Sequence, residues 1–464
     1  MISKNKIKEI LENTLSTGGD YGELFFEDTK KETYLLNNGE VSSINSGTVH
    51  GCGIRIFKKD KCVYGYTNDT SFNSLMNLAS SLKDSFEGEK EHEVQPLKVQ
   101  KGQGLNNPKV EYSSVDINKQ LDLLKEAYKA AKEVDEKIVK VDIRYLITDQ
   151  HVEIYNTDGK ICKDRRLRGR AFISCIASDG QKMQVNSVGP GAQKGFDFFT
   201  DDIDVKALAV KEAKTALVML DAQDCPSGEM TVVIDNGFGG VIFHEACGHG
   251  LEASSVSKNL SVFSGKKGTK VGSDILNAYD DGTIDGAWGS SNFDDEGNKT
   301  QCNQLIKNGV LTSYLVDNFN GRAMGEKGNG ACRRESYKFE PTSRMSNTFI
   351  GNGTSTKEEI IASTKYGLYA ASLGGGSVNP TTGDFNFAVN EGYLIEDGKI
   401  TKPVRGATLI GNGASVLFNI DMIASNLRRE QGMCGASSGS IPADVGQPTI
   451  RVSRMTVGGT GGSK

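Results

Sequence analysis

The chain has 464 residues, of which 37% are hydrophobic and 24% charged, and its formal net charge is −5. This length exceeds the ~250–300 residues at which a single hydrophobic core stops growing, so we expect more than one domain. The composition excludes a disordered chain, and the acidic balance excludes the basic surface typical of a direct nucleic-acid binder.

The first half of the chain predicts helices that alternate with antiparallel strands. Residues 1–16, 71–86, 116–134 and 203–221 have the apolar spacing of amphipathic helices. Residues 23–68 and 138–180 alternate between apolar and polar side chains, with turns at NNGE, KKDK and Asp158-Gly159. The polar segment 87–110 predicts a surface loop.

The segment AQDCPSGEM at 222–230 contains Pro and Gly and precedes a change from long helices and strands to mostly strands. We predict a domain boundary there, giving domains 1–221 and 222–464. The second domain opens with the buried-type strand TVVIDN and continues with hairpins at IKNGVLTSYLV, YLIEDGKITKPV and PTIRVSRMTVGG. Short helices are predicted near 239–253, 357–364 and 415–430. Strands with few long helices predict the α+β class with mostly antiparallel sheets.

Cysteine usage and apolar runs bear on the compartment. The nine cysteines show no CxxC pair and no regular spacing, and a chain of this length does not need disulfide bonds. No uninterrupted apolar stretch reaches ~18 residues, and the amphipathic start differs from a secretory signal. We therefore expect a cytoplasmic protein with reduced thiols and no membrane contact.

Two of the five histidines lie in one hexapeptide, His244-Glu245-Ala246-Cys247-Gly248-His249. Two imidazoles with an adjacent carboxylate supply two neutral ligands and a general base, the set that a catalytic zinc ion uses together with a third ligand and water. The bland alternative is a pair of buried histidines that only satisfy hydrogen bonds in the core.

The spacing of the two histidines differs from the familiar HExxH helix. At i and i+5 the side chains stand ~140° apart on an ideal helix, so both rings could not face one ion. We therefore expect either a π-type bulge or a helix that ends near Gly248 and lets His249 swing back.

The residues alone offer three candidates for a third ligand. Glu252 lies at i+3 from His249, Cys247 lies inside the motif, and Cys434 lies on a glycine-flanked segment, Gln431-Gly432-Met433-Cys434-Gly435. For Cys247 a small buried hydrophobe is the stronger interpretation.

Several long blocks of the sequence resemble the TldD/PmbA family. They are DNGFGGVIFHEACGHGLEAS, GNGACRRESYKFEPTSRMSNTFI, YGLYAASLGGGSVNPTTGDFNFAVNEGYLIEDGKITKPVRGATLIGNG, GMCG and VGQPTIRVSRMTVGGT. They span nearly all of residues 230–460 in order, and the likeness over the first 200 residues is looser. Because the HExxxH motif is present, the chain is similar to the TldD kind of subunit, which is also described as a modulator of DNA gyrase.

The resemblance implies roles for individual residues. His244, His249 and Cys434 would bind the metal, which is zinc or alternatively iron, and Glu245 would be the catalytic base. Cys434 thereby overtakes Glu252 as the expected third ligand. The implied fold is an N-terminal curved sheet with helices, followed by a β-rich, barrel-like C-terminal domain that contains the motif helix.

The implied function is a metallopeptidase that cleaves unfolded or extended peptides and works with a PmbA/TldE-like subunit or as a homodimer. The alternative is a non-catalytic, metal-stabilised regulatory protein, such as a gyrase modulator, that acts by protein binding. No direct contact with nucleic acid is expected.

A substrate-binding segment is expected at Gly374, Gly375 and Gly376. A strand edge without side chains lets a peptide backbone approach and add as an extra strand, although a turn or bulge that serves only the fold is equally compatible. Arg333 and Arg334 are further candidates for substrate contact, against the alternative of structural ion pairs.

Overall fold

Long antiparallel strands form the N-terminal sheet of the computed structural model, which describes residues 2–379 and 381–463. The strands are β1 (Tyr21–Asn37), β2 (Glu40–Lys58), β3 (Lys61–Thr67), β4 (Lys98–Val99), β5 (Ile138–Asn156), β6 (Lys160–Ser178), β7 (Met183–Val188) and β8 (Gly191–Ala192). Their order is β3-β2-β1-β5-β6-β4, and β7 and β8 also pair with β6. The β1–β2 turn lies at Asn38 and Gly39, whose φ angles of 48° and 82° suit a tight hairpin.

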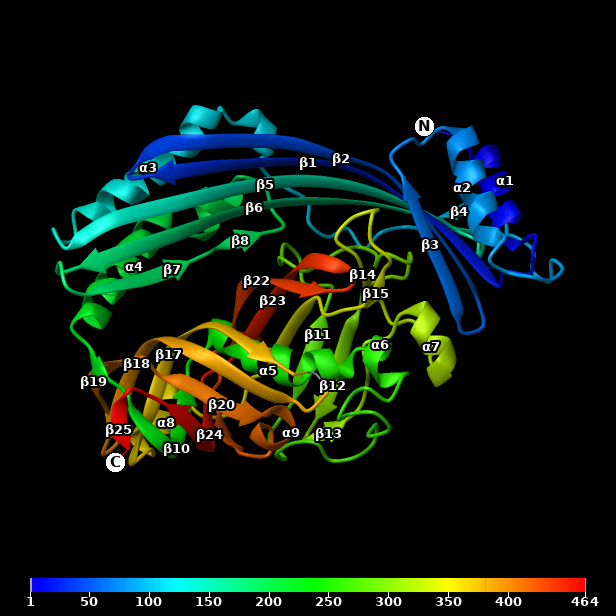
Figure 1. The fold of residues 1–464 in the computed structure, drawn as a ribbon. Coiled ribbons are helices and arrows are strands. Elements are labelled where there is room, and N and C mark those ends of the chain that lie inside the picture. The colour runs from blue at the N-terminus through cyan, green and yellow to red at the C-terminus, as the bar shows by residue number, and fades with distance from the viewer. Residues whose placement is uncertain (1, 380, 464) are drawn as a thin grey trace.

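Two pairs of helices cover the two ends of this sheet (Figure 1). They are α1 (Lys4–Leu15) and α2 (Phe72–Lys83) at one end, and α3 (Ile117–Lys132) and α4 (Val205–Leu220) at the other. Beneath α3 and α4, the buried side chains of β5 and β6 are the odd-numbered ones, such as Ile143, Tyr145, Leu167 and Ile173. Because side chains alternate along a strand, the even-numbered side chains of these strands point to the opposite, concave face.

A closed barrel forms one half of the C-terminal part. Its sheet contains β9 (Gln223–Asp224), β10 (Pro226–Ile234), β17 (Tyr366–Val378), β18 (Asp384–Glu396), β19 (Lys399–Arg405), β20 (Thr408–Asn412), β21 (Ile420–Ile423), β24 (Ile450–Gly458) and β25 (Gly461–Ser463). The order β17-β10-β24-β20-β18 closes on itself because β17 also pairs with β18. A barrel of this kind leaves fewer free edges than an open sheet.

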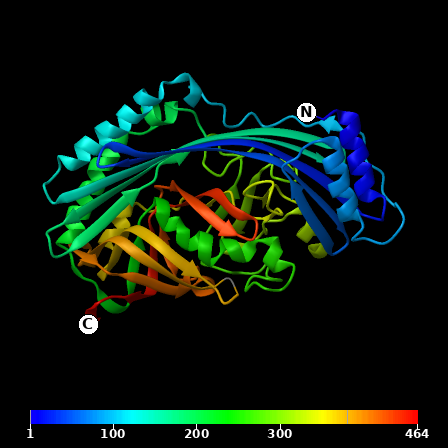
Figure 2. The ribbon, with the colours of Figure 1, turned by 45° about the horizontal axis from the view of Figure 1, so that its top comes forward.

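A second, six-stranded sheet lies beside the barrel and under the arch of the N-terminal sheet (Figures 1 and 2). Its strands are β11 (Ala278–Asp281), β12 (Cys302–Lys307), β13 (Val310–Leu311), β16 (Asn347–Ile350), β22 (Arg428–Ala436) and β23 (Gly439–Gln447). The order β13-β12-β11-β16-β23-β22 makes β22 an edge strand. A separate pair consists of β14 (Cys332–Arg333) and β15 (Thr342–Ser343).

Short helices connect these sheets. They are α5 (Val241–Ala246), α6 (Ala253–Val256), α7 (Asn318–Met324), α8 (Lys357–Ala362) and α9 (Gly413–Val416), with further helical turns η1 (Tyr112–Ser114), η2 (Phe198–Asp202), η3 (Gly237–Gly240) and η4 (Gly248–Leu251). One hydrophobic core is shared by the barrel, the second sheet and α5.

Buried ion pairs join the arch to the C-terminal part. Arg334 donates to Glu23 at 2.8 Å, and Arg55 pairs with both Glu23 and Glu296. These side chains are at most 1% exposed. Separating the two regions would leave buried charges unpaired, so these pairs fix how the N-terminal sheet sits over the C-terminal part.

The structure confirms the predicted α+β class, the curved N-terminal sheet and the barrel-like C-terminal part. The predicted helix at 415–430 is wrong: only a turn of helix at α9 forms, and β21 and β22 follow. The segment 448–459 forms one strand, β24, and not a hairpin. No helix in residues 2–379 and 381–463 combines the length and apolar character needed to cross a bilayer. The predicted domain boundary at 221/222 stays a prediction.

Candidate metal centre

Two histidines of one hexapeptide and a cysteine distant in sequence converge between the barrel and the second sheet. His244, His249 and Cys434 each offer a ligand atom, and these atoms lie within 4.8 Å of one another. Nε2 of His244 lies 3.1 Å from Sγ of Cys434, and Nε2 of His249 lies 3.3 Å from the same sulfur. We call these three residues the metal cluster.

The end of α5 brings the two histidines together. The helix stops at Ala246, and Cys247 leaves helical geometry with φ −126° and ψ −51°. The chain then starts a new turn, η4, which carries His249. The two imidazole rings therefore lie 5.2 Å apart between centroids, at an interplanar angle of 85°. Of the two expected solutions to the i+5 spacing, the early helix end is the one observed.

Close packing around glycines fixes this segment. A Cβ on Gly248 would lie 2.1 Å from the sulfur of Met345, and a Cβ on Gly240 would lie 2.4 Å from the backbone of Gly446. Gly446 belongs to β23, the neighbour of β22, which carries Cys434. The glycines thus let α5 approach the strand pair that presents the third member of the metal cluster.

Cys434 is held by a buried arginine. Arg344 is fully buried and donates to the carbonyl oxygen of Cys434 at 2.6 Å and to the hydroxyl of Ser438 at 2.9 Å. Its Nε also lies 3.7 Å from a carboxylate oxygen of Glu252. Glu252 in turn lies 3.1 Å from Nδ1 of His249. The Arg344 guanidinium therefore contacts both Cys434 itself and the carboxylate that contacts His249.

The charges in the metal cluster favour a thiolate. Burial opposes ionisation of the Cys434 thiol, but His244 and His249 outweigh it and lower its pKa to about 3. Burial disfavours protonation of His249, yet Glu252 and Cys434 raise its pKa well above the ordinary value. A thiolate between two imidazoles is the form that binds a soft or borderline cation.

The donor set and its spacing fit a zinc ion. Zinc binds imidazole nitrogen at about 2.0–2.1 Å and thiolate sulfur at about 2.3 Å, so a tetrahedral site puts nitrogen and sulfur about 3.5 Å apart. The observed separations of 3.1 and 3.3 Å are within a few tenths of an ångström of that value. Three protein ligands leave one position open, as catalytic zinc sites do.

Glu245 lies at the junction of two cavities beside the metal cluster. A cavity of about 200 Å³, the catalytic cavity, is lined by Glu245, His244, Cys434 and the glycines 374–376. A second cavity of about 510 Å³, the side cavity, is lined by Glu245 and His249 among others. The Glu245 carboxylate is 28% exposed, and its Oε2 lies 3.7 Å from Nε2 of His249. It is accessible and close enough to serve an attacking water as a base.

The other candidates for the third ligand lie elsewhere. Glu252 faces Nδ1 of His249, the ring nitrogen remote from the sulfur. Cys247 is fully buried outside the metal cluster, and burial raises the pKa of its thiol well above the ordinary value.

The expected substrate-binding residues fall into two groups. Gly374, Gly375 and Gly376 line the catalytic cavity, as part of β17. Arg334 is buried and its guanidinium contacts Glu23 and the carbonyl of Asp295, so it has the environment of a structural ion pair. Arg333 donates to the carbonyl of Met345 at 2.7 Å and lines a cavity under the arch. A role for either arginine in substrate contact stays a prediction.

Sequence reasoning missed Arg344 and the positioning role of Glu252. Arg344 stands in the quoted block PTSRMSN with no local pattern that marks it, because its partners are 90 or more positions away in the chain. Glu252 was weighed only as a ligand, although its i+3 spacing from His249 also places it beside the ring's second nitrogen.

Comparisons with known proteins identify the family of the chain. The sequence matches PmbA/TldA metallopeptidase domain 1 over residues 22–86, the central domain over 111–220 and the C-terminal domain over 227–459. It is 38% identical to a Haemophilus influenzae protein named Metalloprotease TldD homolog, over 95% of this chain and 93% of that protein. It is 31% identical to a Methanocaldococcus jannaschii metalloprotease, over 97% and 99%.

Solved structures share the fold at lower identity. TldE from Thermococcus kodakarensis superposes with a TM-score of 0.78 at 17% identity, covering 98% of this chain and 99% of that one. A Thermotoga maritima protein described as a candidate modulator of a DNA gyrase gives a TM-score of 0.79 at 20% identity, covering 94% and 96%. With three family domains matched and relatives above 30% identity over nearly the whole chain, this protein belongs to the PmbA/TldD family and is a metallopeptidase.

Proposed function

We propose that the chain is a zinc-dependent peptidase that cleaves unfolded or extended peptides at the metal cluster. The observation that carries the proposal is the approach of two imidazole Nε2 atoms to one buried thiol, beside an accessible carboxylate in a cavity. Iron is the alternative ion, because imidazole and thiolate ligands also suit iron.

The division of labour among the residues follows from their positions. His244, His249 and Cys434 would hold the ion, which when bound supplies a Lewis acid for the scissile carbonyl and acidifies a water molecule. The Glu245 carboxylate accepts the proton of the attacking water. It then returns this proton to the leaving amine, so that the base is regenerated at the end of the cycle.

The shape beside the metal cluster suits an extended backbone. Strand β10 pairs with β17 only over residues 367–370, so the following glycines have no strand neighbour on that side among the described residues. Gly374, Gly375 and Gly376 therefore present backbone groups to the catalytic cavity. A peptide that adds to this edge is bound there through its main chain, which requires an unfolded or extended substrate.

We further propose a PmbA/TldE-like subunit as the partner, because the chain shares its fold with a TldE protein along nearly its whole length. A homodimer is the alternative assembly. Copurification from the native cell followed by mass determination of the complex distinguishes the two. The nine free cysteines suit a reducing compartment, so we propose the cytoplasm as its location.

The decisive experiment compares Glu245→Gln with the parent protein and with Glu358→Gln, an exposed glutamate on α8. Each is assayed for bound metal and for cleavage of an unfolded protein, with the folded form of the same protein as a second substrate. We expect Glu245→Gln to keep its metal and to lose cleavage by a factor of about 10²–10⁴. Full cleavage by Glu245→Gln contradicts the proposed mechanism.

The same assay tests the non-catalytic alternative. The accessible position of Glu245 and the three-ligand cluster favour hydrolysis over a closed structural site. If the metal-loaded chain and its complex cleave no unfolded substrate while metal removal unfolds them, the regulatory alternative replaces the peptidase.

A further inference from the structure

Three arginines form a ladder on the concave face of β6. Arg166, Arg168 and Arg170 occur at alternate positions of the sequence DRRLRGR, so they point to the same face of the strand. Successive arginines stand about 6.7 Å apart along the strand, which is also the repeat of two residues of an extended peptide. On the neighbouring strand β5, Arg144 projects to the same cavity.

The ladder lines a cavity of about 610 Å³ between the arch and the C-terminal part, which we call the arginine cavity. Arg333 and Trp288 lie on its opposite wall, and the Arg170 guanidinium lies 5.6 Å from the centre of the Trp288 ring. Seven basic side chains line this cavity against three carboxylates, in a chain whose net charge is −5. The positive charge is therefore concentrated here and is not a property of the whole surface.

Several of these arginines have no carboxylate partner among the described residues. Arg168 is 5% exposed and donates only to the carbonyl of Trp288 at 3.0 Å and to the side-chain oxygen of Gln193 at 3.3 Å. Arg170 donates to two backbone carbonyls, those of Gly189 and Gln431. Neutral acceptors orient a guanidinium but leave its charge uncompensated.

Other arginines of the cavity differ in this respect. Arg166 pairs with Asp295 at 2.8 Å and Arg334 with Glu23 at 2.8 Å, so both have structural partners. Burial lowers the pKa of Arg168 to about 9, with Arg166 and Arg333 adding to the effect, and burial lowers the pKa of Arg333 to about 10. These guanidinium groups remain charged at neutral pH, and an anion would relieve their mutual repulsion.

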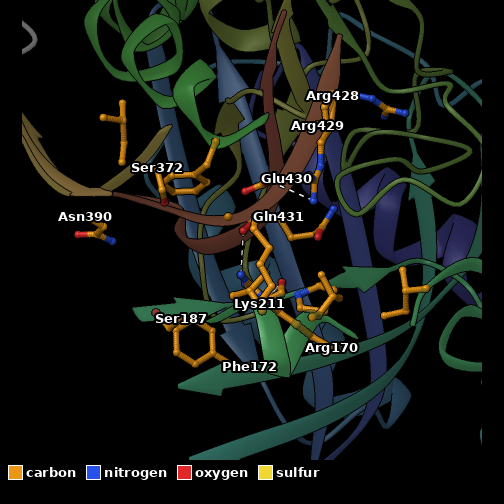
Figure 3. A pocket seen from close by; sticks show the side chains of 18 of the residues that line it. Arg170, Phe172, Ser187, Lys211, Ser372, Asn390, Arg428, Arg429, Glu430 and Gln431 are labelled. Atoms are coloured by element: carbon orange, nitrogen blue, oxygen red, sulfur yellow. Dashed lines mark hydrogen bonds and ion pairs between the residues drawn. The ribbon is translucent and has the colours of Figure 1, made fainter. Parts of the chain in front are cut away.

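The arginine cavity lies next to the cavities that lead to the metal cluster. It shares Arg170, Phe172 and Met433 with a middle cavity of about 830 Å³, which in turn shares Met433 and Gly374 with the catalytic cavity. Figure 3 shows the middle cavity, with Arg170, Phe172 and Lys211 across from residues of the C-terminal part. Met433 lines all three cavities and is the residue directly before Cys434.

We propose that the arginine cavity is a carboxylate-binding subsite of the peptide groove, which takes an aspartate or glutamate side chain or the terminal carboxylate of the substrate. The inference rests on the proposed peptidase function, because it assumes that a peptide runs through the catalytic cavity. Arginine matches the planar carboxylate with paired donors, and the ladder repeats at the spacing of alternate peptide side chains.

The test measures peptide binding by calorimetry on the full chain with Glu245→Gln as background, so that no probe is consumed. Three versions of one short unstructured peptide are compared: one with glutamates and a free carboxyl end, one with glutamine in place of each glutamate, and one with an amidated end. We expect the first to bind about tenfold or more tightly than at least one neutral version, with the advantage decreasing at high salt. The version that loses affinity identifies the source of the carboxylate.

Variants assign the effect to the cavity. Arg168→Gln and Arg144→Gln should each reduce the preference for the acidic peptide, and Arg144 is exposed, so its variant is expected to fold normally. Lys163→Gln is the matched control, because Lys163 is an exposed cation on β6 at an odd position, on the opposite face from the ladder. It should leave the preference unchanged.

Equal binding of all three peptides, with cleavage of neutral peptides retained, overturns the subsite and leaves the proposed function standing. Cleavage of none of the peptides by the parent protein overturns both. A single-stranded oligonucleotide is included as a competitor. If it binds through Arg168 and Arg144 while the acidic peptide shows no advantage, the cavity serves a nucleic acid and the proposal fails.

Discussion

Oε1 of Glu252 lies 3.1 Å from Nδ1 of His249, on the far side of the ring from the Nε2 atom that faces Cys434. This contact fixes the orientation of the imidazole and leaves Nε2 free for an ion. A carboxylate that holds the second nitrogen of a ligating histidine also raises the basicity of the first. We therefore propose that the glutamate at i+3 acts on the metal cluster through His249.

Replacing Glu252 by Gln is expected to weaken zinc binding by a factor of about 10–100, the usual effect of losing such an outer partner. Competition with a chromophoric chelator measures the affinity. Glu245→Gln serves as the contrast, since it should lose cleavage and keep zinc. An unchanged zinc affinity in Glu252→Gln would show that His249 is positioned by other contacts.

Arg344 is expected to be a positioning residue whose loss affects both folding and metal. It is fully buried, and replacing it by Met removes the donors to the Cys434 carbonyl, Ser438 and Gly439. We expect the free energy of unfolding to fall by about 3 kcal/mol, because buried acceptors and the Glu252 charge lose their partner. Urea denaturation measures the change.

The control for Arg344 is Arg454→Gln, which removes an exposed arginine paired with Glu229. Surface pairs contribute little, so the denaturation midpoint should hardly move. If Arg344→Met keeps both parental stability and parental zinc content, Arg344 does not support the cluster.

The fold was predictable where local patterns determine it. The hairpin joining residues 21–58 follows from alternation and an Asn-Gly turn, and helices α1 to α4 follow from their apolar spacing. The helix expected at 415–430 failed because the segment pairs as strands instead: β21 joins β24 of the barrel sheet, and β22, which begins at Arg428, joins β23 of the second sheet. In that segment tertiary packing decides between two periods that the sequence leaves ambiguous.

The metal cluster was predictable in part. The hexapeptide marks His244, Glu245 and His249 by composition, while Cys434 was selected by family resemblance and not by spacing. Nothing local marks Arg344. The alternation in DRRLRGR places Arg166, Arg168 and Arg170 on one face of a strand, but the cavity that they line forms only where the N-terminal sheet meets the C-terminal part. Partners so distant in sequence appear only once the chain is folded.

The open edge of β17 gives a prediction about substrate binding. A Cβ added at Gly375 meets nothing within 4 Å, so Gly375→Val is expected to fold normally. Its side chain would occupy the path of a peptide backbone in the catalytic and middle cavities. We expect KM for an unfolded substrate to rise by about tenfold or more, with unchanged zinc content.

Gly47→Val is the matched control for Gly375→Val. Gly47 lies on β2, and a Cβ there also meets nothing within 4 Å. The control should leave KM and the thermal midpoint as they are. An unchanged KM in Gly375→Val would show that substrates do not pass this edge.

A buried carboxyl gives a prediction about pH and stability. Glu212 on α4 is 4% exposed and accepts a hydrogen bond from Asn186. Burial raises the pKa of Glu212 from 4.5 to about 7, with Glu391 and Glu430 adding to the effect against Lys211. The folded protein therefore holds a proton between these two values that the unfolded chain has already released.

Because the folded state binds more protons in this window, the contribution of Glu212 to stability decreases as pH rises from about 4.5 to about 7 and is constant above it. Glu212→Gln keeps the acceptor for Asn186 and removes the titration, so this variant should be more stable than the parent at pH values above 7 by on the order of 2 kcal/mol, with little difference in acid. Urea denaturation across the pH range measures this difference in stability.

Glu126→Gln, which replaces an exposed glutamate on α3, is the control and should follow the parent curve at every pH. A Glu212→Gln protein that is less stable than the parent above pH 7 would contradict this prediction. It would mean that the folded protein stabilises the ionised Glu212 carboxylate, so that removing its charge lowers the free energy of unfolding.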